Sequence, residues 1–275
     1  MRPQRTICDL TSVSDKEADG HIANAWFDVA RCRNCGAEMH SPHCGQCGQK
    51  IAHRLSFHDI GKESWDRLRF FEMKSARTLR HLLFAPGGVA REYVRGKRTA
   101  HMNPLALLLA LVAFLVLMLA ANQYFQHFGF AGRNSDVDRM SQRVMAFANW
   151  SFSLGIFAIF LGSWITFRRR LGYNAVEHAV LAIYCQCITL ALILVNLLPT
   201  LIWRDSAFIV AHKAASQYYM AALKLLIVGL AYKQFFLLEL RRDWLRLLLA
   251  CGIYAAASWL LLRAYAAAIL WLVTR

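Results

Sequence analysis

The chain divides into a polar first third and a remainder dominated by long apolar runs. The first run without Asp, Glu, Lys or Arg lies within 99–132, and its core reads PLALLLALVAFLVLMLAA over 104–121. A helix of that length crosses about 27 Å of hydrocarbon, so the run predicts a transmembrane helix. Similar runs predict four more spans: between Arg143 and Arg168, between Glu177 and Arg204, over 214–236, and over 247–273.

Basic residues near the ends of these spans predict the orientation. Five lie in the loops on one side, and ten lie on the other: Arg91, Arg95, Lys97, Arg98, Arg168, Arg169, Arg170, Arg241, Arg242 and Arg246. Because cytoplasmic loops carry the excess of Lys and Arg, the N-terminus is expected in the cytoplasm and, with five spans, the C-terminus in the periplasm. Residues 1–30 contain no apolar run, so we expect no cleaved signal peptide.

The segment before the first span predicts a basic amphipathic helix. It begins near Ser56, its polar face is rich in Lys and Arg, and its apolar stripe comprises Phe57, Ile60, Trp65, Leu68, Phe71, Leu79, Leu82 and Leu83. We expect this helix at the membrane interface, or else packed on the preceding domain. Pro86, Gly87 and Gly88 should end it, and a short helix should follow over 89–95.

The basic residues that follow the amphipathic helix are candidate contacts for anionic lipid headgroups: Arg91, Arg95, Lys97 and Arg98. Determination of topology alone is the alternative role for them.

Four cysteines form the strongest local motif. The stretch RCRNCGAEMHSPHCGQCGQK places Cys32, Cys35, Cys44 and Cys47 in a C-x2-C-x8-C-x2-C pattern, with a glycine after each pair. Each C-x2-C turn brings two thiolates to one metal, so the pattern predicts a closed, structural zinc site. Iron is the alternative metal. Free cysteines or two disulfides are the alternatives without metal, and a reducing cytoplasm disfavours the disulfides.

Ionisable residues in the predicted spans form a second candidate site. Glu177 and His178 begin the third span on its cytoplasmic side, and Lys224 lies near the centre of the fourth. Charged groups within a membrane often mark functional sites, which favours a proton relay, a metal or a polar substrate. The alternative for Glu177 is structural, because the helix dipole favours an acidic residue at a helix N-terminus.

Composition agrees with a membrane protein and excludes several other classes. Of the 275 residues, 57% are hydrophobic and 18% are charged, and the formal net charge is +15. These values disfavour a soluble enzyme, a disordered chain and a disulfide-rich mini-protein. The juxtamembrane position of most basic residues explains the charge, so we expect no nucleic-acid partner. No motif for a nucleophile elbow, a zinc protease or a phosphate-binding loop is present, and we expect no enzymatic activity.

Several motifs, taken in order, resemble a bacterial family of uncharacterised multi-pass membrane proteins with an N-terminal zinc ribbon. They are CRNCG with CGQCGQ, then PGGVAREYVRGKR leading into Asn103 and Pro104, then GYNAVEH. The resemblance implies a cytoplasmic ribbon followed by a helical domain in the bacterial inner membrane, and it implies no activity. The positions that correspond to the family's motifs are Arg91, Glu92, Tyr93, Gly96, Lys97, Arg98, Glu177 and His178.

The sequence therefore predicts an all-α membrane bundle of about five spans, preceded by a small zinc ribbon and an interfacial helix. The expected parts are a tail over 1–30, the ribbon over 31–50, the amphipathic and polybasic segment over 51–103, and the membrane domain over 104–275. The favoured function is a membrane-anchored scaffold or regulator that binds a protein partner through the ribbon. The alternative is a transporter or lipid-handling protein with a polar site around Lys224, Glu177 and His178.

Overall fold

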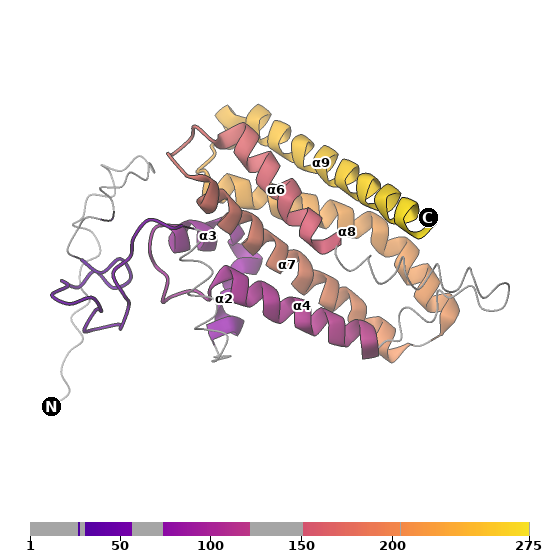
Figure 1. Cartoon of the computed structure of the whole chain (residues 1–275), viewed down its shortest axis with the longest axis horizontal. Helices are drawn as coiled ribbons and strands as arrows, with labels where there is room; N and C mark the ends of the chain where they lie inside the picture. Colours follow the sequence, from indigo (N-terminus) through magenta and orange to yellow (C-terminus); the bar gives the residue numbers. More distant parts are fainter. Residues whose placement is uncertain (1–26, 28–30, 57–73, 122–150, 204, 275) are drawn as a thin grey trace.

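Most of the described part of the chain is helical, and residues 31–56 form turns and loops. The computed structural model describes residues 27, 31–56, 74–121, 151–203 and 205–274 (Figure 1). Its helices are α2 (Lys74–Phe84), α3 (Pro86–Val94), α4 (Pro104–Ala121), α6 (Ser151–Phe167), α7 (Ala175–Ile202), α8 (Ser206–Phe235) and α9 (Leu240–Thr274). β pairing within these residues is limited to two isolated bridges. The predicted all-α class is confirmed.

Three helices are long and apolar enough to cross a membrane, over Ala175–Ile202, Ala207–Phe235 and Leu240–Ile269. Two shorter apolar stretches, Pro104–Leu119 in α4 and Ser153–Phe167 in α6, correspond to the first two predicted spans. The structure therefore supports three of the five predicted spans by length and composition. Both shorter helices border residues 122–150, which lie outside the described residues.

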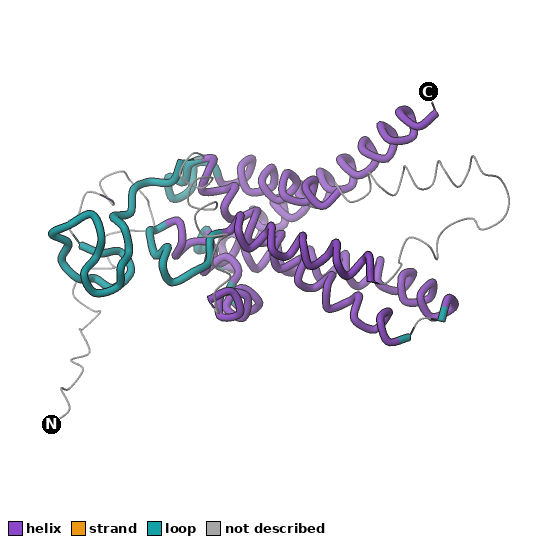
Figure 2. The backbone as a smooth tube through the Cα atoms, turned by 60° about the horizontal axis from the view of Figure 1, so that its bottom comes forward, coloured by secondary structure: helices purple, strands orange, loops and turns teal. Residues whose placement is uncertain are grey.

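Helix α7 occupies the centre of the bundle and contacts α2, α3, α4, α6 and α8. Its most apolar stretch is 67% buried, whereas the corresponding stretches of α8 and α9 are 17% and 11% buried. Figure 2 shows the C-terminal part of α9 diverging from the other helices. The outward faces of α8 and α9 therefore present apolar side chains that suit a lipid environment.

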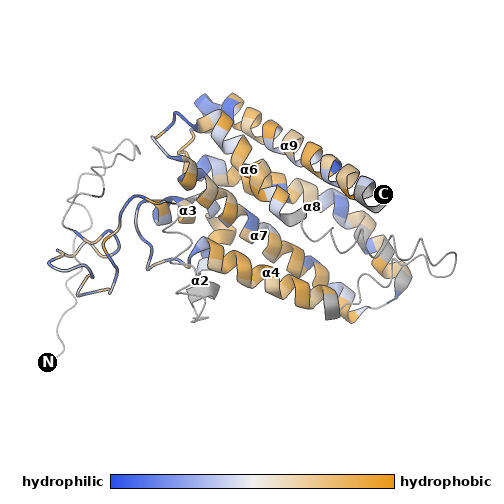
Figure 3. Cartoon of the chain, in the orientation of Figure 1, coloured by the Kyte–Doolittle hydropathy of each residue, from blue (hydrophilic) through white to orange (hydrophobic). Residues whose placement is uncertain are grey.

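Polar residues gather at one end of the bundle (Figure 3). The ribbon (residues 31–50) lies beyond this end, together with the α3–α4 connection, the α6–α7 turn and the start of α9 (Figure 1). Arg170 links the α6–α7 turn to the end of α8 and the start of α9, because its guanidinium donates to the Phe236 carbonyl at 2.9 Å and pairs with Asp243 at 3.0 Å. The basic loops that the sequence assigns to one side therefore lie at one end of the molecule.

Helices α2 and α3 are joined more tightly than the sequence predicts. Helix α3 begins at Pro86 rather than at residue 89, because proline suits the first position of a helix. Gly87 lies against α8, where its N–H donates to Gln234 Oε1 at 3.0 Å, and Gln234 Nε2 donates back to the Phe84 carbonyl at 3.2 Å. One side chain of α8 thus holds the end of α2 and the start of α3.

The amphipathic pattern agrees with α2 in part. Leu82 is fully buried, whereas Leu83 is 49% exposed and Phe84 is 76% exposed. The predicted helix start near Ser56 is followed directly by residues 57–73, and these residues, with the first half of the apolar stripe, lie outside the described residues. The predicted tail over 1–30 also lies outside them, apart from Phe27.

Candidate metal centre

The ribbon consists of two similar turns. In the first, the Gly36 N–H donates to the Cys32 carbonyl and the Cys32 N–H donates to Ala37, both at 2.8 Å. Cys44, Gly48 and Gln49 repeat this arrangement with the same distances in the second turn. Gly36 and Gly48 have φ angles of +78° and +71°, which glycine adopts without steric cost, so the glycine after each cysteine pair closes its turn.

The two turns bring the four cysteine sulfurs together. All four Sγ atoms lie within 4.8 Å of one another, and the Cys32–Cys47 and Cys35–Cys44 pairs are each separated by 3.5 Å. Four sulfurs around one zinc at 2.3 Å would be about 3.8 Å apart, so the observed cluster is close to the required size. The cluster could bind a metal ion such as zinc, as the spacing predicts.

The turns also favour a thiolate at Cys44. The backbone N–H groups of Cys47 and Gln46 point at its sulfur and lower the pKa of Cys44 to about 6. Burial beside neighbouring thiols raises the pKa of Cys35 to about 12. A bound divalent cation deprotonates coordinating thiols outright, so the set of donors suits a metal better than it suits four neutral thiols.

Gln49 makes the first attachment between the ribbon and the helices. It is 5% exposed, its Nε2 donates to the Gly96 carbonyl at 2.7 Å, and its Oε1 accepts from the N–H and the hydroxyl of Thr99 at 3.2 and 3.1 Å. Gly96 has a φ of +103°, and a Cβ there would lie 3.1 Å from Cβ of Arg33. The α3–α4 connection therefore packs directly on the ribbon.

Arg54 makes the second attachment. It lies in the strap, the extended segment 51–56 that follows the ribbon. Its Nε and Nη2 donate to the two carboxylate oxygens of Glu177 at 3.2 and 3.3 Å, and Nη2 also donates to the Gly172 carbonyl at 2.6 Å. Glu177 has a fully buried side chain. Such a two-pronged pair fixes both partners in orientation.

Glu177 also begins helix α7. The Asn174 N–H donates to its Oε2 at 2.6 Å, while the Glu177 N–H donates to Asn174 Oδ1 at 2.9 Å. This reciprocal capping box satisfies two N–H groups at the start of the helix. The structural interpretation of Glu177 as a helix-start residue therefore agrees with the observed contacts, and Arg54 supplies the neutralising charge.

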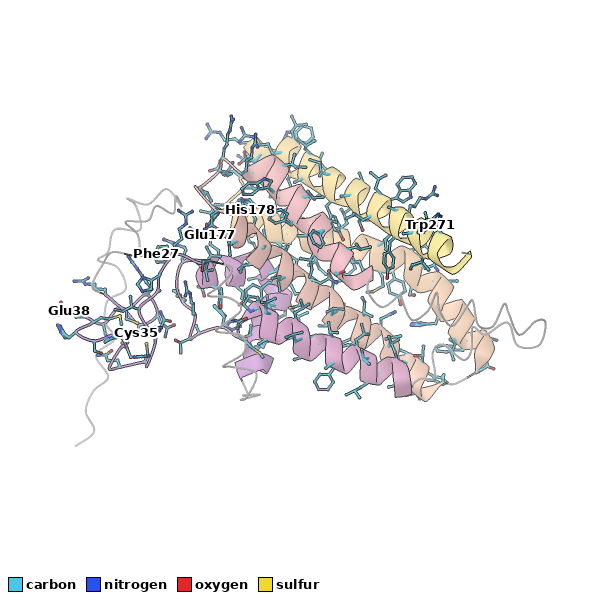
Figure 4. All side chains as sticks on the ribbon, in the orientation of Figure 1. Phe27, Cys35, Glu38, Glu177, His178 and Trp271 are labelled. Carbon is cyan, nitrogen blue, oxygen red and sulfur yellow. The ribbon has the colours of Figure 1, made fainter. Side chains whose placement is uncertain are left out.

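His178 points in a different direction from Glu177 (Figure 4). Its ring packs edge-on against Trp164 with centroids 5.2 Å apart and lies 5.3 Å from the ring of Phe236. Its Nδ1 lies 3.0 Å from Ser163 Oγ, and Ser163 donates its own proton to the Phe160 carbonyl. His178 therefore donates from Nδ1 inside an aromatic layer between α6, α7 and α8.

The structure does not bring Lys224 to this end of the bundle. Lys224 is half-buried in α8, about three turns before the helix ends at Phe235. Within the described residues, no hydrogen bond or ion pair joins it to Glu177 or His178. The three residues of the second candidate site thus lie in separate surroundings.

The four candidate lipid contacts differ in position. Arg98 is buried and donates to the His53 carbonyl of the strap, and Lys97 pairs with Glu92 at 3.3 Å. Arg91 is partly buried beside the Tyr173 hydroxyl, and Arg95 ends α3. Arg98 is therefore placed to hold the strap rather than a lipid.

No local sequence pattern marks Gln49 or Arg54 as functional. Their partners lie 47 and 123 residues further along the chain, beyond the reach of any local pattern. The only local signal was the acidic residue three positions after Asn174, which is typical of a capping box.

Comparison with known proteins finds one similar family, and that family has no assigned activity. A family model described as a protein of unknown function (DUF3667) matches residues 72–116. The matched residues include α2, α3 and the PGGVAREYVRGKR sequence. No curated protein and no solved structure matches the chain. The expected resemblance to a family without assigned function is confirmed in this coarser form, together with the four-cysteine cluster near the N-terminus.

Proposed function

We propose that the chain is a multi-pass membrane protein that acts as a membrane-anchored scaffold or regulator and binds a protein partner through a zinc ribbon. The observation that carries this proposal is a four-cysteine cluster fixed at one end of an apolar helical bundle. Four thiolates leave no open coordination position, so the metal supplies structure rather than catalysis. Catalysis forms no part of the proposal.

The bacterial inner membrane is the location that fits the resemblance and the charge distribution. The basic residues of the α3–α4 connection, the α6–α7 turn and the start of α9 lie at the ribbon end, which we place in the cytoplasm. Zinc sites with four thiolates require reduced cysteines, and the cytoplasm keeps them reduced. Arg91, Arg95 and the exposed Lys97 lie at the same end, and we infer that they contact anionic headgroups.

The surface proposed for the partner is the face of the ribbon that points away from the helices. Glu38 and His40 have side chains exposed by 71% and 87%, whereas Gln49 on the opposite face is buried against the α3–α4 connection. Figure 4 shows Glu38 at the end of the molecule that is farthest from the bundle. A partner can therefore approach this face without disturbing the attachments to the helices.

Native mass spectrometry of the full chain in native-lipid discs tests the proposal, because one spectrum reports metal, lipid and protein partners. We expect one zinc per chain and a stoichiometric protein partner, and we expect Cys35→Ser to lose both. Cys251→Ser is the matched control, since Cys251 lies in α9 away from the cluster. Cys35→Ser protein that retains one metal per chain would overturn the metal site, and iron in place of zinc would correct the metal.

Lys224 favours a second candidate function, a transporter or lipid-handling protein. A half-buried ammonium within a candidate span is costly unless it binds an anionic group. Lys224→Met should then remove a bound anionic lipid or small molecule from the mass spectrum, whereas Lys233→Met, at an exposed position near the end of α8, should not. Equal binding by wild type and Lys224→Met would exclude this function.

A further inference from the structure

The strap connects the metal cluster to the start of α7 through a short segment of chain. Cys47 is a member of the cluster, Gln49 follows it by two residues, and Arg54 by seven. Gln49 bonds the α3–α4 connection, and Arg54 bonds Glu177 and Gly172 at the start of α7. The position of Arg54 therefore depends on the second cysteine turn on one side, and on the bonds that the His53 and Leu55 carbonyls accept from Arg98 and Asn174.

The ribbon has little internal structure apart from the cysteine cluster and the turns that carry it. Its β pairing is limited, within the described residues, to the isolated bridges Arg31–Glu38 and His43–Lys50, and further backbone hydrogen bonds lie within the two turns and between Ile51 and Pro42. The hydrophobic side chains buried between residues 31 and 56 are those of Cys32, Cys44, Ala52 and Leu55. A segment with so small a core takes its folding free energy from the metal, and it loses its fixed shape when the metal leaves.

Release of Arg54 would alter the bundle itself. Glu177 is fully buried, and removal of one partner from a buried ion pair leaves an uncompensated charge, which is strongly destabilising. The same carboxylate completes the capping box with Asn174 at the start of α7. Because α7 contacts five other helices, its first turns connect the ribbon to the centre of the membrane domain.

We propose that the ribbon and strap form a metal-dependent latch, in which a bound metal holds Arg54 on Glu177 and metal loss loosens the first turns of α7. This inference rests on the proposed metal site and adds a regulatory role to it. The chain would thereby report the occupancy of a cytoplasmic metal site to the membrane helices.

Hydrogen–deuterium exchange of the full chain in lipid nanodiscs tests the latch. The protein is loaded with zinc, its metal content is measured, and exchange is compared before and after removal of zinc with a chelator. We expect exchange to rise about tenfold or more in residues 31–56 and also in residues 173–181, because the latter lose a buried ion pair. Exchange in the middle of α9 should stay unchanged.

A double variant separates the latch from a general loss of stability. In Arg54→Gln/Glu177→Gln the buried charge and its partner are both neutral, so residues 173–181 should no longer respond to zinc removal while residues 31–50 still do. Arg246→Gln is the matched control, because Arg246 pairs with Asp243 at 3.3 Å at the same end of the bundle and both residues belong to α9. It should respond to zinc removal as wild type does.

The outcomes distinguish the latch from the metal site. Protein that binds no metal overturns both proposals. Protein that binds zinc, and whose residues 31–50 loosen on zinc removal while residues 173–181 do not, overturns the latch alone. A double variant in which residues 173–181 still respond to zinc as wild type does would also overturn it, since the coupling would then bypass Arg54.

Discussion

Replacement of Gly87 by alanine should separate two helices that now touch through their backbones. Gly87 is the second residue of α3 and lies against α8. A Cβ at this position would lie 2.1 Å from the Ala231 carbonyl oxygen and 2.7 Å from the Phe235 nitrogen. Both are backbone atoms that cannot rotate away, so α3 would have to move from α8 by about 1 Å to reach ordinary contact distance.

The size of the effect follows from two contributions. Overpacking in a well-packed core costs about 1–3 kcal/mol. The displacement also stretches the hydrogen bond from the Gly87 N–H to Gln234 Oε1, now 3.0 Å, and such a bond contributes about 0.5–1.5 kcal/mol. We therefore expect Gly87→Ala to lower the free energy of unfolding by about 2–4 kcal/mol, which corresponds to a fall in Tm of about 5–15 °C.

The neighbouring glycine provides the control. A Cβ at Gly88 would lie 3.4 Å from the Cβ of Ala85, which is ordinary contact. Alanine is more favourable than glycine within a helix by about 0.5–1 kcal/mol, so Gly88→Ala should unfold at the wild-type temperature or slightly above it. Thermal unfolding of both variants in one detergent, followed by circular dichroism, measures the difference. Gly87→Ala protein with a wild-type Tm would refute the close packing of α3 on α8.

Three further variants test other parts of the structure. The hydrogen bond from His101 lowers the pKa of Glu92 to about 2. The ionised Glu92 carboxylate therefore contributes its full stabilisation above about pH 4.5, and this stabilisation is lost as pH falls toward 2. The Tm difference between wild type and Glu92→Gln should shrink over that range. Cys35→Ser should lose the bound metal and expose residues 31–50 to limited proteolysis, and an unchanged digestion pattern would contradict metal-dependent folding. Gln49→Ala removes the Gln49 donor from the Gly96 carbonyl and the acceptor of the two Thr99 hydrogen bonds, so proteolysis within the ribbon should become faster while metal content stays the same.

The helices and the cysteine cluster could be predicted from the sequence because both depend on local patterns. Apolar runs of helical length give α4, α6, α7, α8 and α9 their positions, since hydrocarbon excludes charged side chains over a fixed length. The cysteine cluster follows from a spacing that two short turns satisfy on their own. In each case the residues that determine the structure are close together in the chain.

The attachments between these parts could not be predicted in the same way. Arg54 and Glu177 are 123 residues apart, and Gly87 and Gln234 are 147 residues apart. Each contact depends on the mutual arrangement of the helices, and an apolar run predicts a helix without predicting which other helix it packs against. The sequence predicts only that Pro86, Gly87 and Gly88 end a helix. The structure shows in addition that Gly87, which has no side chain, allows the backbone of α8 to approach closely.

The arrangement of the helices also limits which residues could form the ligand site of a transporter or lipid-handling protein. Glu177 lies in the first turn of α7 at the ribbon end, and Lys224 lies about three turns, or about 16 Å, from the end of α8 at Phe235. That distance is about half the thickness of the hydrocarbon core, so no small polar substrate can contact both side chains at once. Glu177 is moreover already neutralised by Arg54. A ligand of the bundle would therefore bind Lys224 without Glu177, and mutation of Glu177 should affect the ribbon attachment rather than the binding of that ligand.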